Sequence, residues 1–389
     1  MNFFDKEFLT THIQSILDFY EPNVIDVNGG YAQNFYDDGS VFNVDQKQLV
    51  SSTRLIVNYA LSAQLFDNIH YRQNALHGLK FLEESHFLED ENKFVWTFKD
   101  GKPNDLTQQA YGYAFVLLAY SQLKKTNIIQ SDEWIDKTFN MLETTFWQEE
   151  FGLYADELSE DNVLSDYRGQ NSNMHLCEAM IAAYEATQNP KYLARAKILA
   201  FNIAIKQADL SNGLVWEHFN TQFKIDWEYN KNDPKNLYRP WGFQPGHQTE
   251  WTKLLLQLYQ YDPQEWMLER AKTLFDTAWN VAWDHNNGGL FYGFDTDKNI
   301  CDDDKYFWVQ AESFAAAALL YKATNDEKYL ERYNKLWQYS WDHFVDHENG
   351  AWYRVLKADN SKYSNKKSEA GAKCDYHTIC ACLEVLKML

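Results

Sequence analysis

The chain has 389 residues, of which 45% are hydrophobic and 16% aromatic, so it carries enough apolar material for a large core. Its formal net charge of −20 disfavours nucleic acid and anionic membrane surfaces as partners. No signal peptide, bilayer-spanning apolar run or C-x-x-C pair is evident, which predicts a cytoplasmic protein with reduced thiols and no membrane partner.

An aromatic, strand-like stretch followed by a helix-like stretch recurs along the whole chain, at intervals of about sixty residues. The strand-like stretches begin at Gly29, Lys93, Gly152, Gly213, Gly289 and Gly350. A repeat of this kind stacks equivalent helices side by side. We therefore expect the first residues of all the equivalent helices to lie at the same end of the molecule.

A second set of helices follows the first. Amphipathic runs begin at Asn189 and Asp326, and a looser copy begins at Pro263. Each unit thus reads as two helices joined by a turn, and six pairs make twelve helices. This predicts an all-α protein, an (α/α)6 barrel with short β-hairpins in the connecting loops, in a single catalytic domain spanning residues 1–389. Periodicity alone leaves an open superhelix as the alternative.

Polar residues interrupt the apolar pattern of the first two units. Arg54 lies beside Leu55, Ile56 and Val57, and Tyr111 lies near the start of the next helix. A polar side chain on a helix that otherwise resembles core must face a cavity or a partner. We expect both residues to face the cavity of the barrel.

The third unit is polar where its helix is predicted to begin. Asn171 or Asn173 could cap that helix, and His175 and Glu178, three residues apart, share one face. A histidine–glutamate pair that only anchors the helix end is the alternative for this segment.

The later units continue the pattern. His247 and Glu250 repeat the three-residue spacing after a Pro-Gly bend, Trp308 and Glu312 share a face of the fifth helix, and His377 precedes the last one. Two H-x-x-E patterns at equivalent places in a repeat favour one shared site over two accidental pairs.

Such a set of side chains suits proton transfer. Histidine titrates near neutrality, and we expect the adjacent carboxylates to raise its pKa. Two histidines on opposite sides of a substrate could remove and return a proton while an arginine stabilises the oxyanion formed in between. Three other interpretations stay open: a metal site, a glycosidase using two of the glutamates, and a carbohydrate-binding barrel without turnover.

Four motifs resemble the N-acylglucosamine 2-epimerase superfamily. They are residues 173–179, 245–251 and 308–312 and the Tyr376-His377 pair, and they keep the family's order over nearly the whole chain. Residues 217–222 and 229–234 are most similar to the branch of mannose isomerases and sulfoquinovose isomerases. Residues 308–312 are as similar to the epimerases as to the isomerases, which leaves the two reactions as alternatives.

The resemblance implies an enzyme without metal or cofactor that acts on a small monosaccharide. It assigns proton transfer to His377 and His247, ring opening to His175, and stabilisation of enediolate oxygens to Arg54. The substrate pocket would be shaped by Tyr111, Asn171, Asn173, Glu250, Trp308 and Glu312. The reaction implied is the interconversion of D-mannose and D-fructose through a cis-enediolate, with a sugar 2-epimerase or a sulfoquinovose isomerase as alternatives. The sequence carries no signal for the oligomeric state.

Overall fold

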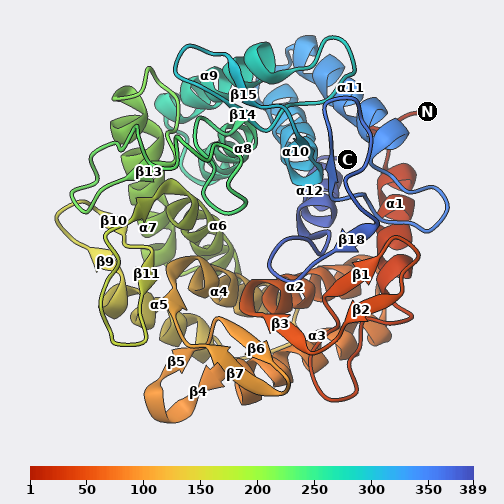
Figure 1. Ribbon diagram of the computed structural model, residues 1–389, viewed down its shortest axis with the longest axis vertical. Helices are drawn as coiled ribbons and strands as arrows, with labels where there is room; N and C mark the ends of the chain where they lie inside the picture. The colour runs from red at the N-terminus through yellow and green to blue at the C-terminus, as the bar shows by residue number, and fades with distance from the viewer.

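The protein is a double ring of twelve α-helices, shown by a computed structural model that describes residues 1–389 (Figure 1). The inner ring consists of α2 (Leu49–Phe66), α4 (Ala110–Lys125), α6 (Gln170–Thr187), α8 (Pro245–Tyr261), α10 (Phe307–Thr324) and α12 (Tyr376–Leu386). The outer ring consists of α1 (Lys6–Tyr20), α3 (Ile69–Phe81), α5 (Glu133–Thr145), α7 (Pro190–Phe201), α9 (Glu265–Ala282) and α11 (Glu327–His343). Short π-helical turns follow α3 and α7 (Leu82–His86 and Asn202–Gln207), and a 3-10 turn spans Glu89–Glu91.

The inner ring is closed. Each inner helix contacts the next along the chain, and α12 contacts α2. Each inner helix also packs against the outer helix that follows it, except that α12 packs against α1 at the other end of the chain. The first helix therefore completes the last pair. This confirms the (α/α)6 barrel and excludes the open superhelix.

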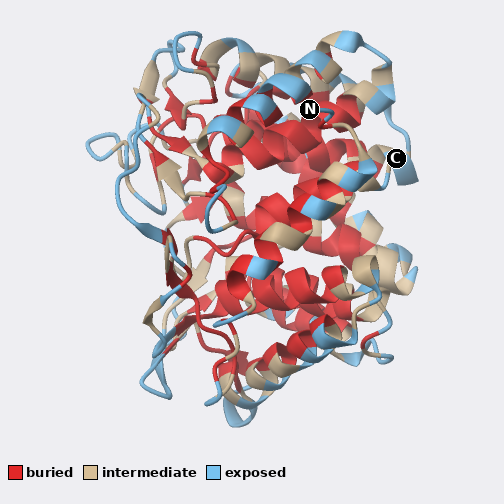
Figure 2. Ribbon diagram, turned by 90° about the vertical axis from the view of Figure 1, so that its right-hand side faces the viewer, coloured by how far each residue is buried: buried red, intermediate tan, exposed pale blue.

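The burial pattern explains which helices lie inside. In α10, Ala315 to Ala318 are all fully buried, and small side chains on every face allow neighbouring helices to approach from both sides. In α11 only one stripe is buried, including Tyr329, Leu336 and Trp337, while the opposite face is solvated. Figure 2 shows the result, with buried inner helices and exposed residues confined to the periphery and the loops. None of the helices combines the length and apolar character needed to cross a membrane.

Short antiparallel strands occupy the loops before the inner helices, as predicted. They are β1 (Asn34–Tyr36), β2 (Val41–Asn43), β3 (Gln46–Gln48), β4 (Phe87–Leu88), β5 (Lys93–Phe94), β6 (Thr97–Lys99), β7 (Lys102–Asp105), β8 (Gln108–Gln109), β9 (Trp147–Gln148), β10 (Leu153–Tyr154), β11 (Glu157–Leu158), β12 (Arg168–Gly169), β13 (His218–Phe219), β14 (Gly293–Phe294), β15 (Ile300–Asp302), β16 (Lys305–Tyr306), β17 (Val355–Leu356) and β18 (Lys366–Ser368).

These strands join the loops of neighbouring units into a belt. The pairs β3–β6, β8–β11, β12–β13 and β16–β17 each link one unit to the next, and a bridge between Phe243 and Phe294 links the fourth to the fifth. The belt closes where β18 pairs with β1. It fixes the loops at the end of the barrel where the inner helices begin.

A side chain in the first turn of several inner helices holds the extended stretch before it. The amide of Asn173 accepts from Tyr154 N at 2.8 Å and donates to Tyr154 O at 3.0 Å. Gln248 makes the same pair of bonds to Val215, and Gln310 makes them to Leu290. Each of these residues is the fourth of its helix. The amide thus ties each inner helix to its own unit.

The expectation that Asn171 or Asn173 caps α6 is wrong. The helix begins at Gln170, with Gly169 as its N-cap, and both asparagines lie inside the first turn. The polar character of the segment does not mark the cap. It reflects the tie that Asn173 makes to the preceding stretch and the orientation of Asn171 toward the interior.

Candidate active site

Three histidines on the inner helices share one hydrogen-bonding arrangement. Each directs Nδ1 to a carboxylate, and Nε2 of none of them is hydrogen-bonded within the protein. The pairs are His175 with Glu178 at 3.0 Å, His247 with Glu217 at 2.9 Å, and His377 with Glu312 at 2.7 Å. A carboxylate at Nδ1 holds the proton on that nitrogen and leaves the Nε2 lone pair free. All three rings are therefore arranged to accept a proton at Nε2.

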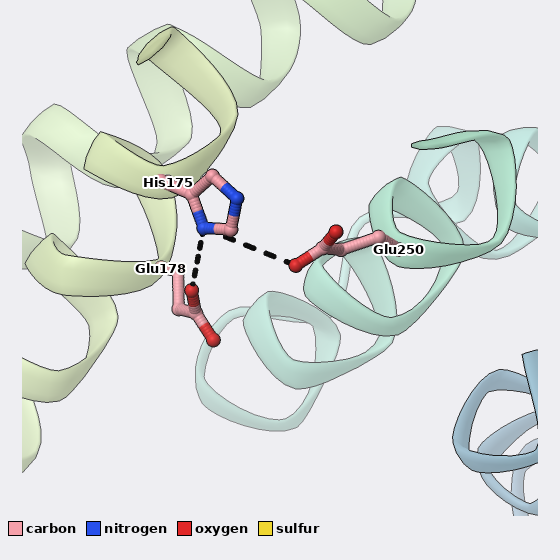
Figure 3. Close-up of side chains that lie close together, drawn as sticks. All are labelled: His175, Glu178 and Glu250. Atoms are coloured by element: carbon pink, nitrogen blue, oxygen red, sulfur yellow. Dashed lines mark hydrogen bonds and ion pairs between the residues drawn. The ribbon is translucent and has the colours of Figure 1, made fainter. Parts of the chain in front are cut away.

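The two H-x-x-E motifs are not equivalent, contrary to the expectation. His175 is the sixth residue of α6, whereas His247 is the third residue of α8. Because the two histidines lie at different depths in their helices, Glu250 does not pair with His247. It approaches His175 instead, with 3.9 Å between Glu250 Oε1 and His175 Nδ1 (Figure 3). The two motifs converge on one cluster but contribute to it differently.

The partner of His247 was not among the expected site residues. Glu217 lies in the loop just before β13, and its Oε2 also accepts from Gln170 Nε2 at 2.9 Å. Its other oxygen is buried without a partner. No helical periodicity could have pointed to a loop residue. The only available signal was its place in residues 217–222, the stretch most similar to the isomerase branch.

A second unexpected member of the site is Lys253, one turn after Glu250 on α8. Its Nζ lies 2.5 Å from Glu312 Oε2 and 3.8 Å from the nearest oxygens of Glu178 and Glu250. The side chain is only 4% exposed. Lys253 stands in an apolar run, Trp251 to Leu256, so the argument that singled out Arg54 applies equally to it.

Arg54 is buried without a carboxylate in salt-bridge distance. Its Nη2 donates to the Tyr111 hydroxyl at 2.9 Å, and its guanidinium carbon lies 4.3 Å from the ring centre of Phe115 and 5.1 Å from that of Tyr376. Its Nε has no acceptor. A buried guanidinium held by aromatic rings, with donors left over, is suited to an oxygen that carries negative charge.

The remaining expected residues fall into two groups. Trp308 lies between two of the histidines, with its ring centre 5.1 Å from that of His247 and 5.7 Å from that of His377. Asn171 shares a face of α6 with His175, and its Oδ1 is buried without a partner. Asn173 is different because both ends of its amide are bonded to the backbone of Tyr154. The structure thus places Asn173 outside the cluster.

Burial dominates the protonation of the site. It lowers the pKa of His175 and of His377 below the usual range, and for His377 the positive charge of Arg54 acts in the same direction. The expectation that the carboxylates raise these values is wrong, because the loss of hydration outweighs their attraction. Burial together with the nearby Glu312 raises the pKa of Glu250 well above its usual range. The site therefore favours the neutral forms of His175 and His377 and the protonated form of Glu250.

The same side chains form two groups with the composition of a metal site. They are His175, Glu178 and Glu250, and Glu250, Glu312 and His377, with possible ligand atoms within 4.8 Å of one another in each group. The ammonium of Lys253 already lies among the three glutamates, and both Nδ1 atoms are hydrogen-bonded to carboxylates. The donor set is thus largely satisfied by the protein, and we assign no metal to it.

Comparison with known proteins gives full-length matches. Residues 29–381 match the family described as N-acylglucosamine 2-epimerase (GlcNAc 2-epimerase). A protein of Marinomonas mediterranea named D-mannose isomerase is 54% identical over 390 residues, which cover 100% of this chain and 98% of the relative. A cellobiose 2-epimerase of Ruminococcus albus is 24% identical over 399 residues, which cover 98% and 97% of the two chains. A crystal structure of D-mannose isomerase matches with a TM-score of 0.98 at 53% identity and 100% coverage of both chains.

Proposed function

The chain belongs to the N-acylglucosamine 2-epimerase family, and from this premise we propose that it is a sugar isomerase that interconverts D-mannose and D-fructose. The observation that carries the proposal is the set of three buried histidines, each with a carboxylate at Nδ1 and a free Nε2, beside an arginine without a carboxylate partner. The high full-length identity to a protein named D-mannose isomerase supports the choice of substrate and reaction.

The proposed reaction begins with the open-chain aldose, and His175 assists the opening of the sugar ring. Nε2 of His377 removes the proton from C2, the electrons of the broken C–H bond form the C1=C2 double bond, and O1 becomes negatively charged. Arg54 stabilises this oxygen in the cis-enediolate, since its guanidinium has donors to spare. A proton then passes from O2 to O1, and the carboxyl of Glu250, which has no protein partner, is suited to carry it. A proton is finally returned to C1 by His377 or by its partner His247, which leaves the ketose.

His247 provides the second proton-transfer group. In an isomerase it would act with His377 on the two carbons, whereas in a 2-epimerase it would return the proton to C2 from the opposite face. Trp308 between the two rings would stack against the sugar, and Tyr111, Asn171 and Glu312 would complete the pocket. The same chemistry on a sulfonated sugar would make the protein a sulfoquinovose isomerase, so sulfoquinovose is the alternative substrate.

Three further points belong to the proposal. The reaction proceeds without a metal, which is supported by the ammonium of Lys253 among the glutamates. The whole chain, residues 1–389, acts as one domain, supported by the pairing of α1 with α12 and of β1 with β18. The protein works in the cytoplasm, supported by its five cysteines, none of them in a disulfide.

Incubation of the purified protein with D-mannose, followed by sugar chromatography, tests the proposed function. Fructose as the product supports the isomerase, and glucose without fructose indicates a 2-epimerase. An unchanged sugar that nevertheless binds would contradict turnover of mannose and favour a binding barrel. A parallel incubation with sulfoquinovose decides between the two isomerase substrates.

A further inference from the structure

The buried lysines of this protein fall into two kinds. Lys305 bonds to Asp284 at 2.8 Å and to the backbone carbonyl of Ala358 at 3.0 Å. Lys367 likewise bonds to Asp346 at 2.6 Å and to the carbonyl of Gly350 at 2.9 Å. One carboxylate and nearby carbonyl groups are the partners of a lysine that pins a loop. These lysines stabilise the belt around the inner helices.

Lys253 is of a different kind because three carboxylates lie within ion-pair distance of its ammonium, whereas each of the other buried lysines has one. Its three neighbours are carboxylates of the candidate active site, from Glu312, Glu178 and Glu250. Burying an ammonium is costly unless it is paired, and a loop could have been pinned at less cost near the surface. The placement of Lys253 therefore calls for an explanation at the site itself.

Glu312 connects this lysine to a histidine. Its Oε2 lies 2.5 Å from Lys253 Nζ, and its Oε1 lies 2.7 Å from His377 Nδ1. The carboxyl group of Glu312 is fully buried on α10, so water does not stabilise its charge. The ammonium of Lys253 is the lysine or arginine cation within ion-pair distance that can keep it ionised. If Glu312 were protonated, it could no longer accept hydrogen bonds strongly at both oxygens. The charge on Glu312, and with it the arrangement of His377, depends on Lys253.

We propose that Lys253 is a positioning residue for the reaction: by holding Glu312 as a carboxylate, it keeps a proton on Nδ1 of His377 and leaves Nε2 free to take the proton from the sugar. The inference rests on the proposed function only where it names the sugar. The arrangement of Lys253, Glu312 and His377 exists in the free protein and can be tested without substrate.

Titratable or charged side chains on four neighbouring helices affect the protonation of His377. They are Arg54 on α2, His175 and Glu178 on α6, Lys253 on α8 and Glu312 on α10. Burial lowers the pKa of His377, and Arg54, His175 and Lys253 lower it further. If Lys253 is removed and Glu312 takes up a proton, His377 loses a positive and a negative neighbour together, so its pKa changes little. The tautomer of His377 changes instead, because a neutral Glu312 no longer holds the proton on Nδ1.

A cavity behind the cluster makes Lys253 accessible to small molecules. The cavity has a volume of about 730 Å³, lies toward the C-terminal ends of the inner helices, and is lined by Glu178, Lys253 and Tyr376 on its inner side. Its rim includes the exposed residues Gln260 and Lys387, so it opens to solvent. A small amine added to a variant that lacks the lysine side chain can reach the vacated position.

The direct test is the titration of His377 by NMR on protein with ¹⁵N-labelled histidine, assigned by difference with a His377→Asn variant. In the natural protein we expect Nε2 to be unprotonated at neutral pH. The ¹⁵N shifts of the two ring nitrogens distinguish the tautomers, and in Lys253→Met neutral His377 should carry its proton on Nε2 in a large part of the molecules. In Lys305→Met, the matched control, the Nδ1–H tautomer should persist while the melting temperature falls. An unchanged Nδ1–H tautomer in folded Lys253→Met overturns the proposal.

Kinetics give a second readout. In Lys253→Met we expect kcat to fall about 10- to 100-fold, as for other groups that orient a reacting side chain, with KM changed by less than about threefold. In Lys253→Ala, ethylammonium should restore activity in a saturable way, whereas ethanol should not.

The outcomes separate the two proposals. If the natural protein does not convert mannose, the proposed function fails while the NMR titration still decides the role of Lys253. If Lys253→Met and Lys253→Gln both fail to fold while Lys305→Met folds, Lys253 is structural and the inference is wrong. If the variants fold and lose activity without any change of tautomer or rescue by the amine, the inference is wrong as well.

Discussion

Replacement of Arg54 by methionine should remove catalysis and leave the fold intact. The substitution keeps the length and apolar character of the side chain and removes the guanidinium. That group donates to the Tyr111 hydroxyl and rests on the rings of Phe115 and Tyr376, with Nε unpaired. Nothing in the free protein neutralises its charge at close range. Its best partner is the oxygen that becomes negative during enolisation.

The expected magnitudes follow from these contacts. Loss of a donor to a developing oxyanion costs about 10²- to 10³-fold in kcat, or roughly 3–4 kcal/mol of transition-state stabilisation. For folding, the variant loses three cation–π contacts of about 0.5–2 kcal/mol each, with Tyr111, Phe115 and Tyr376, and the hydrogen bond to the Tyr111 hydroxyl. It also avoids burying a cation without a carboxylate, which costs several kcal/mol. The free energy of unfolding should therefore stay the same or increase.

Steady-state conversion of mannose and thermal melting measure the two effects on the same samples. The matched control is Arg195→Met, because Arg195 binds both oxygens of Glu143, at 2.5 and 2.7 Å, away from the histidine cluster. The control should lose about 1.5–3 kcal/mol of stability and keep its kcat. If Arg54→Met keeps normal turnover, or if it unfolds while Arg195→Met does not, Arg54 is a structural residue.

Four further predictions concern the same site. His377→Asn and His247→Asn should each lower kcat by about 10²- to 10⁴-fold without lowering the melting temperature; near-normal turnover in either variant would move proton transfer to Glu250 or Glu312. Because His377 acts as a neutral base and its pKa is lowered, kcat/KM should stay level as the pH falls through 6.5, the ordinary pKa of histidine, and decline only at lower pH; a decline centred above 6.5 would contradict the lowering of the pKa by burial. Exhaustive chelation should leave activity unchanged, and a loss reversed by a divalent ion would show that a metal takes part. Asn173→Leu leaves N–H and C=O of Tyr154 without partners and should lower stability by about 2 kcal/mol or more with an unchanged KM; a higher KM at unchanged stability would return Asn173 to the pocket.

The fold could be predicted because it repeats. The same helix pair recurs in six similar units. The clear amphipathic patterns that begin at Asn189 and Asp326 therefore support a helix at Pro263, where the pattern is weaker. Closure could not be derived from periodicity, which is the same for a ring and for a superhelix. It depends on contacts between the two ends of the chain, α1 with α12 and β1 with β18.

The site could be predicted only in part. Polar residues on apolar inner helices, such as Arg54 and His175, can be recognised because burying a polar side chain without a partner costs free energy. Which side chains of two neighbouring helices meet depends on how far each residue lies from the start of its helix. A short sequence motif does not contain that distance. For this reason Glu250 was expected beside His247 and lies beside His175 instead. Glu217 lies in a loop, outside any helical pattern.

Asn173 shows what a comparison across the repeat adds. It shares a motif with His175 and belongs to the stretch that resembles the family, so we predicted it in the pocket. Gln248 and Gln310 occupy the same position in later units and make the same backbone bonds. Comparing the fourth residue of each inner helix across the repeat favours a structural role for Asn173. A repeat thus helps to separate side chains that every unit needs from those that one site needs.

The central claim is that a side-chain base moves a proton between C2 and C1 of the sugar. Conversion of D-mannose in D2O over many turnovers, followed by NMR of the products, tests it most directly. We predict fructose that carries deuterium at C1, because the proton held by the histidine exchanges with solvent before it is returned. Glucose with deuterium at C2 and no fructose would establish a 2-epimerase instead. Fructose free of deuterium after many turnovers would contradict proton transfer by a solvent-exchanging base.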